Sequence, residues 1–167
     1  MILQSDRVQL VPLSNADLKD FHETNTNPFV RKYLWDDEVI PEATSAEILN
    51  DVQSKFEQER WGLWKILDLA QGHYLGYAGL WQFFGGRQPQ LLYALLPENT
   101  GQGYATEASR AVIDYAFKIL DFEDLIAAVD APNTASVEVC RRLEMTLDEE
   151  KEIEGKPTLI FRLEKEY

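Results

Sequence analysis

The stretch that most constrains the fold is residues 95–108, LLPENTGQGYATEA, where an apolar run meets a glycine-rich turn that leads at once into an amphipathic helix. Apolar residues recur with helical spacing from Ala105 to Ile119, which predicts a helix from about Tyr104 to Leu120. Such a turn leaves backbone N–H groups free at the positive end of the helix. That end suits an anion, especially a phosphate or pyrophosphate. The sequence therefore predicts an anion-binding turn before this helix.

The chain is strongly acidic, with a formal net charge of −13 over 167 residues. A field of this sign repels nucleic acids and anionic membranes and attracts cations. We therefore predict neither a nucleic-acid nor a membrane partner, although an acidic surface also serves solubility alone. An anionic ligand has to be bound by local donors against this field, and the glycine-rich turn is such a cluster of donors.

The composition is that of a globular protein, with 45% hydrophobic and 11% aromatic residues. Its apolar runs fall short of the roughly 20 residues that cross a bilayer. The opening MILQSDRVQLVPL lacks the basic and apolar regions of a signal peptide. Cys140 is the single cysteine, so an internal disulfide is excluded. We predict one domain spanning residues 1–167 and a cytoplasmic location.

Hydrophobic patterning predicts a mixed order of strands and helices. Strands are expected at residues 7–12, 61–67, 74–81, 90–96, 125–129, 146–153 and 158–163. Helices are expected to begin at Ser14, near Phe29, at Thr44, near Tyr104 and at Asn133. Ser14 and Thr44 each have an acidic residue three positions later, as in a capping box.

The connections between these elements predict the sheet topology. Because residues 90–96 and 125–129 flank a helix, these two strands should be parallel, with a right-handed crossover. The strands before them are joined by short links and should be antiparallel. We therefore expect the α/β class, with a central, mostly antiparallel twisted sheet of about six or seven strands and helices on both faces.

Three glycine motifs compete for the turn. A P-loop needs a lysine after its last glycine, and Tyr104 follows Gly103, so this motif is excluded. A dinucleotide fingerprint needs a third glycine where Thr106 stands. Asp130 does follow the next strand, as that fingerprint requires, so this alternative stays open. The antiparallel strands before the turn argue against it.

The third motif is a family resemblance. Residues 100–105, TGQGYA, resemble the Q/R-x-x-G-x-G/A acetyl-CoA motif of the GNAT N-acetyltransferase superfamily, and the longer GQGYATEA resembles its ribosomal-protein N-terminal acetyltransferase branch. The opening DRVQLVPLSNADL and the later NTASVEVCRRLEM resemble segments of that branch in the same order, so the resemblance spans nearly the whole chain. It implies a three-layer α-β-α domain that transfers an acetyl group from acetyl-CoA to a primary amine.

The resemblance also implies where acetyl-CoA binds. The strands at 90–96 and 125–129 would splay apart, and the pantetheine arm would lie between them, bonded to the backbone of Leu95 and Leu96. Asn133 would contact the pantetheine. A purely structural role is the alternative, with Asn133 capping a helix and the glycines supplying positive φ. The amides that would hold the pyrophosphate are those of Thr100, Gly101, Gln102, Gly103, Tyr104, Ala105 and Thr106.

Ser136 would lie near the sulfur, and we predict it as the catalytic proton donor to the departing thiolate, with Tyr93 as a second catalytic candidate. Relatives often read Glu-Ile-Gly-Tyr where this chain reads QLLY at 90–93, so a carboxylate is missing there. Thr100 and the pair Glu144–Met145 also depart from the family pattern. A regulator that binds acyl-CoA without turnover is therefore the alternative function, and a nicotinamide-nucleotide enzyme is a third.

The missing carboxylate affects which kind of amine the site can acetylate. An α-amino group, with a pKa of about 7.7–8.0, is about 20% neutral at pH 7, whereas a lysine amine is neutral in fewer than about one molecule in a thousand. A weakly basic site therefore suits a protein N-terminus or another small amine. The sequence leaves open whether the protein is a monomer or a homodimer.

Two aromatic segments, residues 33–38 and 81–84, form the candidate acceptor pocket. The first also carries carboxylates, and both carboxylates and aromatic faces bind cations. An ordinary acidic loop over a core tryptophan is the alternative. His22 and His73 stand apart from other ligand residues, so no metal is predicted. The predicted acceptor residues are Trp35, Asp36, Asp37, Trp81 and Phe83, with Phe84 beside them.

Overall fold

An eight-stranded sheet organises the protein in the computed structural model, which describes residues 1–83, 86 and 88–167. The strand order is β1-β2-β3-β4-β5-β6-β8-β7, and the neighbours are antiparallel except for β5 and β6, which are parallel. The strands are β1 (Leu3–Gln4), β2 (Val8–Pro12), β3 (Leu63–Asp68), β4 (Tyr74–Trp81), β5 (Gln90–Leu95), β6 (Asp124–Asp130), β7 (Thr146–Ile153) and β8 (Lys156–Glu164).

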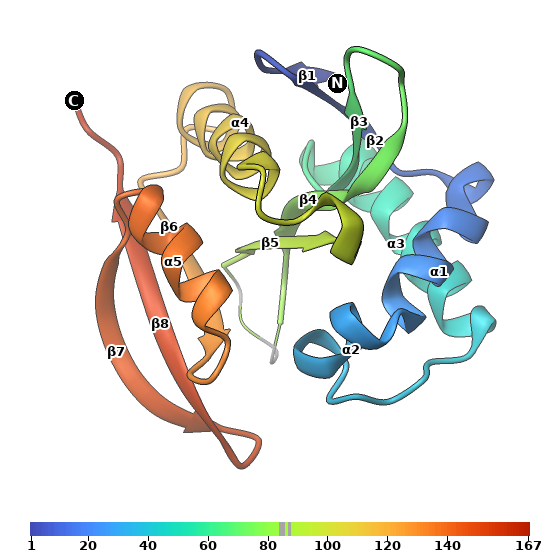
Figure 1. The fold of residues 1–167 in the computed structure, drawn as a ribbon. Helices are drawn as coiled ribbons and strands as arrows, with labels where there is room; N and C mark the ends of the chain where they lie inside the picture. Colours follow the sequence, from blue (N-terminus) through green and yellow to red (C-terminus); the bar gives the residue numbers. More distant parts are fainter. Residues whose placement is uncertain (84–85, 87) are drawn as a thin grey trace.

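Helices cover both faces of the sheet. Figure 1 shows α1, α2 and α3 on one face and α4 and α5 on the other. The α/β class, the mostly antiparallel sheet and the helical layers on its two faces are therefore confirmed. The helices are α1 (Leu18–Thr26), α2 (Pro28–Leu34), α3 (Glu42–Glu59), α4 (Tyr104–Lys118) and α5 (Thr134–Arg142), with 3-10 turns at Asn15–Asp17 and Pro97–Asn99.

Some boundaries differ from the sequence prediction. The sheet has eight strands where six or seven were expected, because β1 has two residues and is too short to show a period. The capping box at Ser14 is confirmed, since the Ser14 N–H donates to the Asp17 carboxylate over 2.9 Å. The start at Thr44 is wrong. Helix α3 begins at Glu42, after Pro41, whose fixed φ of −65° ends the preceding loop.

The core consists of two apolar layers separated by the sheet. On the α4 side, Trp64, Val112 and Leu125 are fully buried. On the α1 side, Phe21 and Tyr77 pack with their ring centroids 5.0 Å apart. The alternation of side chains along a strand decides which layer each residue joins. In the site, the same alternation decides on which face of the sheet each side chain of β5 and β6 lies.

Candidate active site

Strands β5 and β6 open a cavity between them. Their described register has one parallel pair, Gln90 with Ile126, and the strands diverge beyond it. The cavity between them has a volume of about 740 Å³, a size typical of ligand sites. It is lined from α2, β5, β6, α5 and the glycine-rich turn. The predicted site residues among its lining are Tyr93, Leu95, Thr100, Gly101, Gly103, Tyr104, Ala105, Thr106, Asn133 and Ser136.

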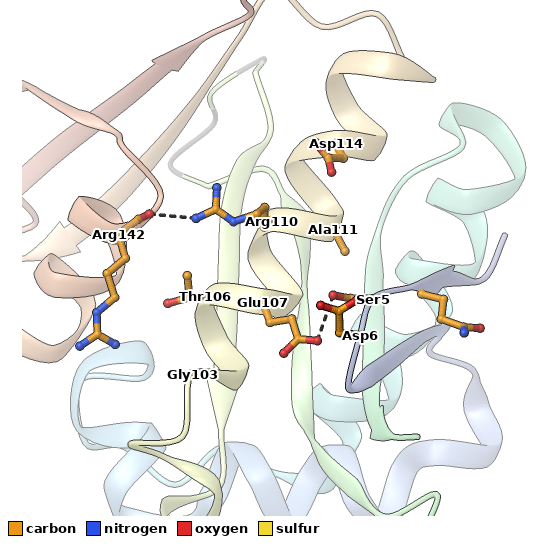
Figure 2. Close-up of a pocket in the computed structure, with 10 residues that line it drawn as sticks. Ser5, Asp6, Gly103, Thr106, Glu107, Arg110, Ala111, Asp114 and Arg142 are labelled. Atoms are coloured by element: carbon orange, nitrogen blue, oxygen red, sulfur yellow. Dashed lines mark hydrogen bonds between the residues drawn. The ribbon is translucent and has the colours of Figure 1, made fainter. Parts of the chain in front are cut away.

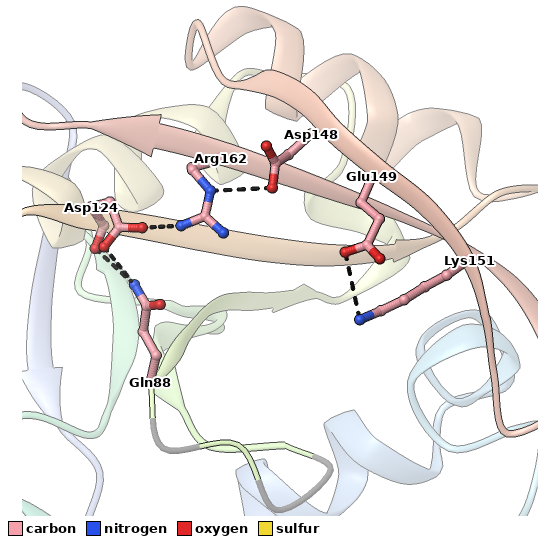
Figure 3. A network of polar contacts seen from close by, with 6 residues as sticks. All are labelled: Gln88, Asp124, Asp148, Glu149, Lys151 and Arg162. Carbon is pink, nitrogen blue, oxygen red and sulfur yellow. Dashed lines mark hydrogen bonds and ion pairs between the residues drawn. The ribbon is translucent and has the colours of Figure 1, made fainter.

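A polar network holds the two strands together at the closed end of this gap (Figure 3). The Gln88 side-chain amide donates to the Asp124 carboxylate over 3.0 Å and to its backbone carbonyl over 3.1 Å. Arg162 on β8 pairs with Asp124 and donates from Nε to Asp148 over 3.2 Å. These contacts join the beginning of β5 to the beginning of β6 and to the β7–β8 hairpin. The gap therefore widens toward the carboxyl ends of β5 and β6.

The glycine-rich turn forms one wall of the cavity and presents the start of α4 to it. Gly101 and Gly103 have φ of +75° and +84°, which favours glycine, so their conformational role is confirmed. Gly103 is the N-cap of α4 and has no side chain with which to cap the first amides. The first four N–H groups of an α-helix lack partners within the helix. The wall therefore combines free donors with the positive helix end, as an anion site requires.

Arg7 holds this turn in place, and sequence reasoning missed it. Its backbone N–H and Nε donate to the two carboxylate oxygens of Glu107 over 2.7 and 2.8 Å. Its Nη1 donates to the Gln102 carbonyl over 2.9 Å, and its guanidinium lies 4.6 Å from the centroid of the Tyr104 ring. The Ser5 hydroxyl donates to Glu107 as well, over 2.9 Å. The turn between β1 and β2 is thus clamped to the first turn of α4.

A second cavity, of about 450 Å³, adjoins the clamp (Figure 2). It shares Gly103, Thr106 and Arg142 with the larger cavity, so the two spaces meet at the start of α4. The Arg110 guanidinium donates to the Arg142 carbonyl over 2.9 Å and ties α4 to α5 at this point. The region around the predicted pyrophosphate site is therefore held by contacts from the β1–β2 turn and from α5.

Two hydroxyl groups meet inside the larger cavity. Tyr93 on β5 and Ser136 on α5 lie 2.8 Å apart, Oη to Oγ. Burial raises the pKa of Tyr93 to about 12, although the bond to Ser136 acts to lower it. Tyr93 is therefore protonated at neutral pH and available as a donor. The Asn133 side chain accepts from the Ser136 N–H over 3.3 Å, so Asn133 caps α5 while also lining the cavity.

Two predicted cofactor residues lie outside the described lining of the cavity. The Leu96 N–H donates to the Leu75 carbonyl over 3.2 Å, and its own carbonyl accepts from Asn99 over 2.9 Å. The Gln102 carbonyl accepts from Arg7. Their expected contacts with the cofactor stay predictions. Leu95, next to Leu96, does line the cavity.

The predicted acceptor residues are likewise absent from the described lining of the cavity. Trp35 donates from Nε1 to Asn25 over 3.2 Å, which fits the alternative of a loop tryptophan docked on the core. Asp37 pairs with Arg31 over 3.0 Å, and Asp36 pairs with Lys156. Trp81 packs against the α1-side layer, and Phe83 is half-buried. Phe84 lies outside the described residues.

Helix α2 supplies lining on this side, of which sequence reasoning missed Phe29 and Lys32. Phe29, Lys32 and Tyr33 line the cavity, as does Asp130 at the end of β6. The Tyr33 hydroxyl donates to the Pro132 carbonyl over 3.4 Å and so bridges the open end of the gap. The position of Asp130 at the carboxyl end of a parallel strand is a sequence signal for such a site.

Among the described residues there is neither a metal-ligand cluster nor a membrane-spanning helix. They contain no group of three or more His, Cys, Asp or Glu side chains placed to hold a metal ion. None of the helices formed by these residues is long and apolar enough to span a membrane.

Comparisons with known proteins agree with this geometry. The family model for the acetyltransferase (GNAT) domain matches residues 7–146. Spermidine N(1)-acetyltransferase of Escherichia coli (strain K12) is 26% identical over 152 residues, covering 86% of this chain and 75% of that protein. An acetyltransferase structure from Agrobacterium tumefaciens str. C58 is similar with a TM-score of 0.86, 22% identity, and 99% and 95% of the two chains covered. RimL, the ribosomal L7/L12 α-N-protein acetyltransferase in complex with coenzyme A, is similar with a TM-score of 0.81, 15% identity and 98% of each chain covered.

Proposed function

This chain belongs to the GNAT acetyltransferase family, and we propose that it transfers an acetyl group from acetyl-CoA to a primary amine, either a protein N-terminus or a small amine. The similar proteins support both acceptor classes. One is named for acetylating spermidine, and another for acetylating the α-amine of a ribosomal protein. The reaction uses acetyl-CoA as a co-substrate and no metal.

The observation that carries the proposal is the cavity between β5 and β6, with a phosphate-type site in its wall and a hydroxyl pair inside it. A thioester cofactor with a pyrophosphate needs both features. Its pyrophosphate would bind the amides of residues 100–106, and its pantetheine arm would lie along β5 beside Leu95. The acyl group would then reach Tyr93 and Ser136. The amine would enter from the α2 side.

The proposed chemistry is a direct displacement. The neutral amine attacks the thioester carbonyl, a C–N bond forms, the C–S bond breaks, and the electron pair leaves with the sulfur as a thiolate. A thiol has a pKa of about 8.5, so Tyr93, at about 12, is a weaker acid by some three to four pKa units, or about 5 kcal/mol. We therefore propose that the Tyr93–Ser136 pair stabilises the thiolate by hydrogen bonding, in place of the proton-donor role expected of Ser136 from the sequence. The proton lost from the amine completes the thiol.

Ligand-induced thermal shifts test the cofactor assignment, because a ligand that binds the folded state raises the melting temperature. Acetyl-CoA, NAD and ATP are compared in parallel, and a shift with acetyl-CoA alone is expected. The variant Gly101→Glu places a carboxylate at the phosphate site and should abolish that shift. Gly72→Glu is the matched control, because both glycines have φ near +75° and an added Cβ meets open space at each. A shift with NAD but not acetyl-CoA would overturn the assignment.

Release of CoA with a panel of amines tests the activity itself. Turnover with at least one primary amine is expected. The buried Gln90, where relatives often have glutamate, motivates the alternative of a CoA-binding regulator. Binding of acetyl-CoA without turnover on any acceptor would favour that alternative.

A further inference from the structure

Asp130 occupies the side of the gap opposite the hydroxyl pair. On β6, Leu125, Ala127 and Val129 pack into the α4-side layer. Side chains alternate along a strand, so Asp130 faces the α2 side. Tyr93 belongs to the α4-side layer. One cavity therefore has hydroxyl groups on the cofactor side and a carboxylate on the acceptor side.

Lys156 is the cation that Asp130 shares with Asp36. The Lys156 Nζ lies 3.7 Å from the Asp130 carboxylate and also contacts that of Asp36, and these are the ion pairs the two carboxylates make among the described residues. Asp130 pairs in register with Thr158, so Lys156 is its diagonal neighbour on the same face. One ammonium between two carboxylates leaves a net charge of −1 at this corner.

Other charged groups lie near this corner, and the carboxylates among them are paired. Lys32 lines the cavity and lies 5.2 Å from the ring centroid of Tyr33. Asp37 pairs with Arg31. Glu138, at the far side of the cavity, pairs with two arginines of α5, over 3.6 and 3.7 Å. The Asp130–Lys156–Asp36 group therefore carries a local charge of −1, and the ammonium of Lys32, which contacts a neutral ring, is a separate positive charge on the cavity wall.

We propose that Asp130 binds a second, non-reacting ammonium group of the acceptor, and that Lys156 occupies this place in the free protein. The proposal rests on the proposed acetyltransfer. A lysine side chain is an alkylammonium, so the fold already holds one at this corner. An acceptor with two amines replaces Lys156 on Asp130, and Lys156 stays on Asp36. The other amine, neutral, then faces the thioester. The acceptor class is therefore a small diamine or polyamine.

Calorimetric titration of the CoA-saturated protein tests this without requiring turnover. The probes are 1,5-diaminopentane and 1-aminopentane, which have the same chain length and differ in one ammonium. The diamine is expected to bind more tightly. Asp130→Asn should weaken diamine binding about fivefold and bring the two dissociation constants close together, while Lys156→Met should tighten diamine binding about threefold.

Lys165→Met is the matched control, because Lys165 pairs with Asp121 just beyond the other end of β8, roughly 30 Å from Lys156. It should leave both dissociation constants unchanged. Wild-type affinity of Asp130→Asn for the diamine would overturn the proposal, as would equal weakening of both amines. If diamine binding depends on Asp130 but no amine releases CoA, the proposed acetyltransfer fails and this ammonium site stands.

Discussion

The Tyr93 hydroxyl lies 2.8 Å from the Ser136 hydroxyl, although the two residues are 43 positions apart in the chain. This contact joins β5 to the first turn of α5 across the open end of the gap. In a hydrogen-bonded pair, one hydroxyl donates to the other, and the second donates outward. The pair can therefore present one oriented O–H group to the sulfur of the proposed acetyl-CoA.

A shared donor predicts that the two hydroxyls act as a unit. Tyr93→Phe and Ser136→Ala should each lower kcat about tenfold to a hundredfold, with little change in the KM for acetyl-CoA. The double variant should lose little more than the worse single variant, because groups acting as a unit are non-additive. Steady-state CoA release measures all three.

Tyr74→Phe is the matched control for this double-mutant cycle. Its hydroxyl lies 2.9 Å from the Thr24 hydroxyl and, like that of Tyr93, is largely buried, but it lies outside the described cavity lining. This variant should keep wild-type kcat. Multiplicative losses in the double variant would show that Tyr93 and Ser136 act independently.

The Arg7–Glu107 clamp predicts a stability that depends on pH. Burial alone would raise the pKa of Glu107, but hydrogen bonds from the Arg7 backbone, the Arg7 side chain and Ser5 lower it below 4.5. A lowered folded-state pKa stabilises the protein above the usual value, and this contribution is lost as pH falls through the lowered value. Glu107→Gln should therefore cost about 1 kcal/mol at pH 7, or ~3 °C in Tm. The difference should vanish well below pH 4.5.

Glu59→Gln provides the comparison for this pH series. Glu59 makes one exposed pair with Lys55 within α3, of a kind that contributes about 0.3–0.5 kcal/mol. Its effect on Tm at pH 7 should be the smaller of the two. A Glu107→Gln difference that persists unchanged into acid would contradict the clamp, because protonation would then have no effect on it.

The closed end of the gap gives a third prediction. Arg162→Ala removes the cation between Asp124 and Asp148 and should lower the free energy of unfolding by about 1–2 kcal/mol. Urea unfolding would show this as a lower midpoint with an unchanged m-value. Lys151→Ala removes an exposed ion pair of 3.6 Å on the same hairpin and should change stability by less than about 0.5 kcal/mol. Equal midpoints for the two variants would contradict the role of Arg162.

The sequence predicted the parts of the site whose patterns are local. Helix α4 has a clear period, the glycine turn fixes its start, and the position of Tyr93 follows from its strand. Arg7 was missed because its partner, Glu107, lies 100 residues away, and no periodic pattern reports such a pair. Lys156 and Asp36 are 120 residues apart. The sequence assigned Asp36 to the acceptor pocket because an ion pair with a lysine so distant in the chain could not be predicted.

Cys140 gives the last prediction, because it lines the cavity and is buried. Burial raises the pKa of its thiol to about 11. At pH 8 about one thiol in a thousand is then ionised, against about a quarter for a free cysteine of pKa ~8.5, and the thiolate is the reactive form. A thiol-specific chromogenic reagent should therefore label the native protein about two orders of magnitude more slowly than the urea-unfolded chain. With the unfolded chain, one equivalent of the coloured product should form rapidly, because the chain has one cysteine. Saturating acetyl-CoA should slow labelling of the native protein further, because the proposed function places it in the same cavity. Rapid native labelling, unaffected by acetyl-CoA, would place the thiol outside the cofactor's path.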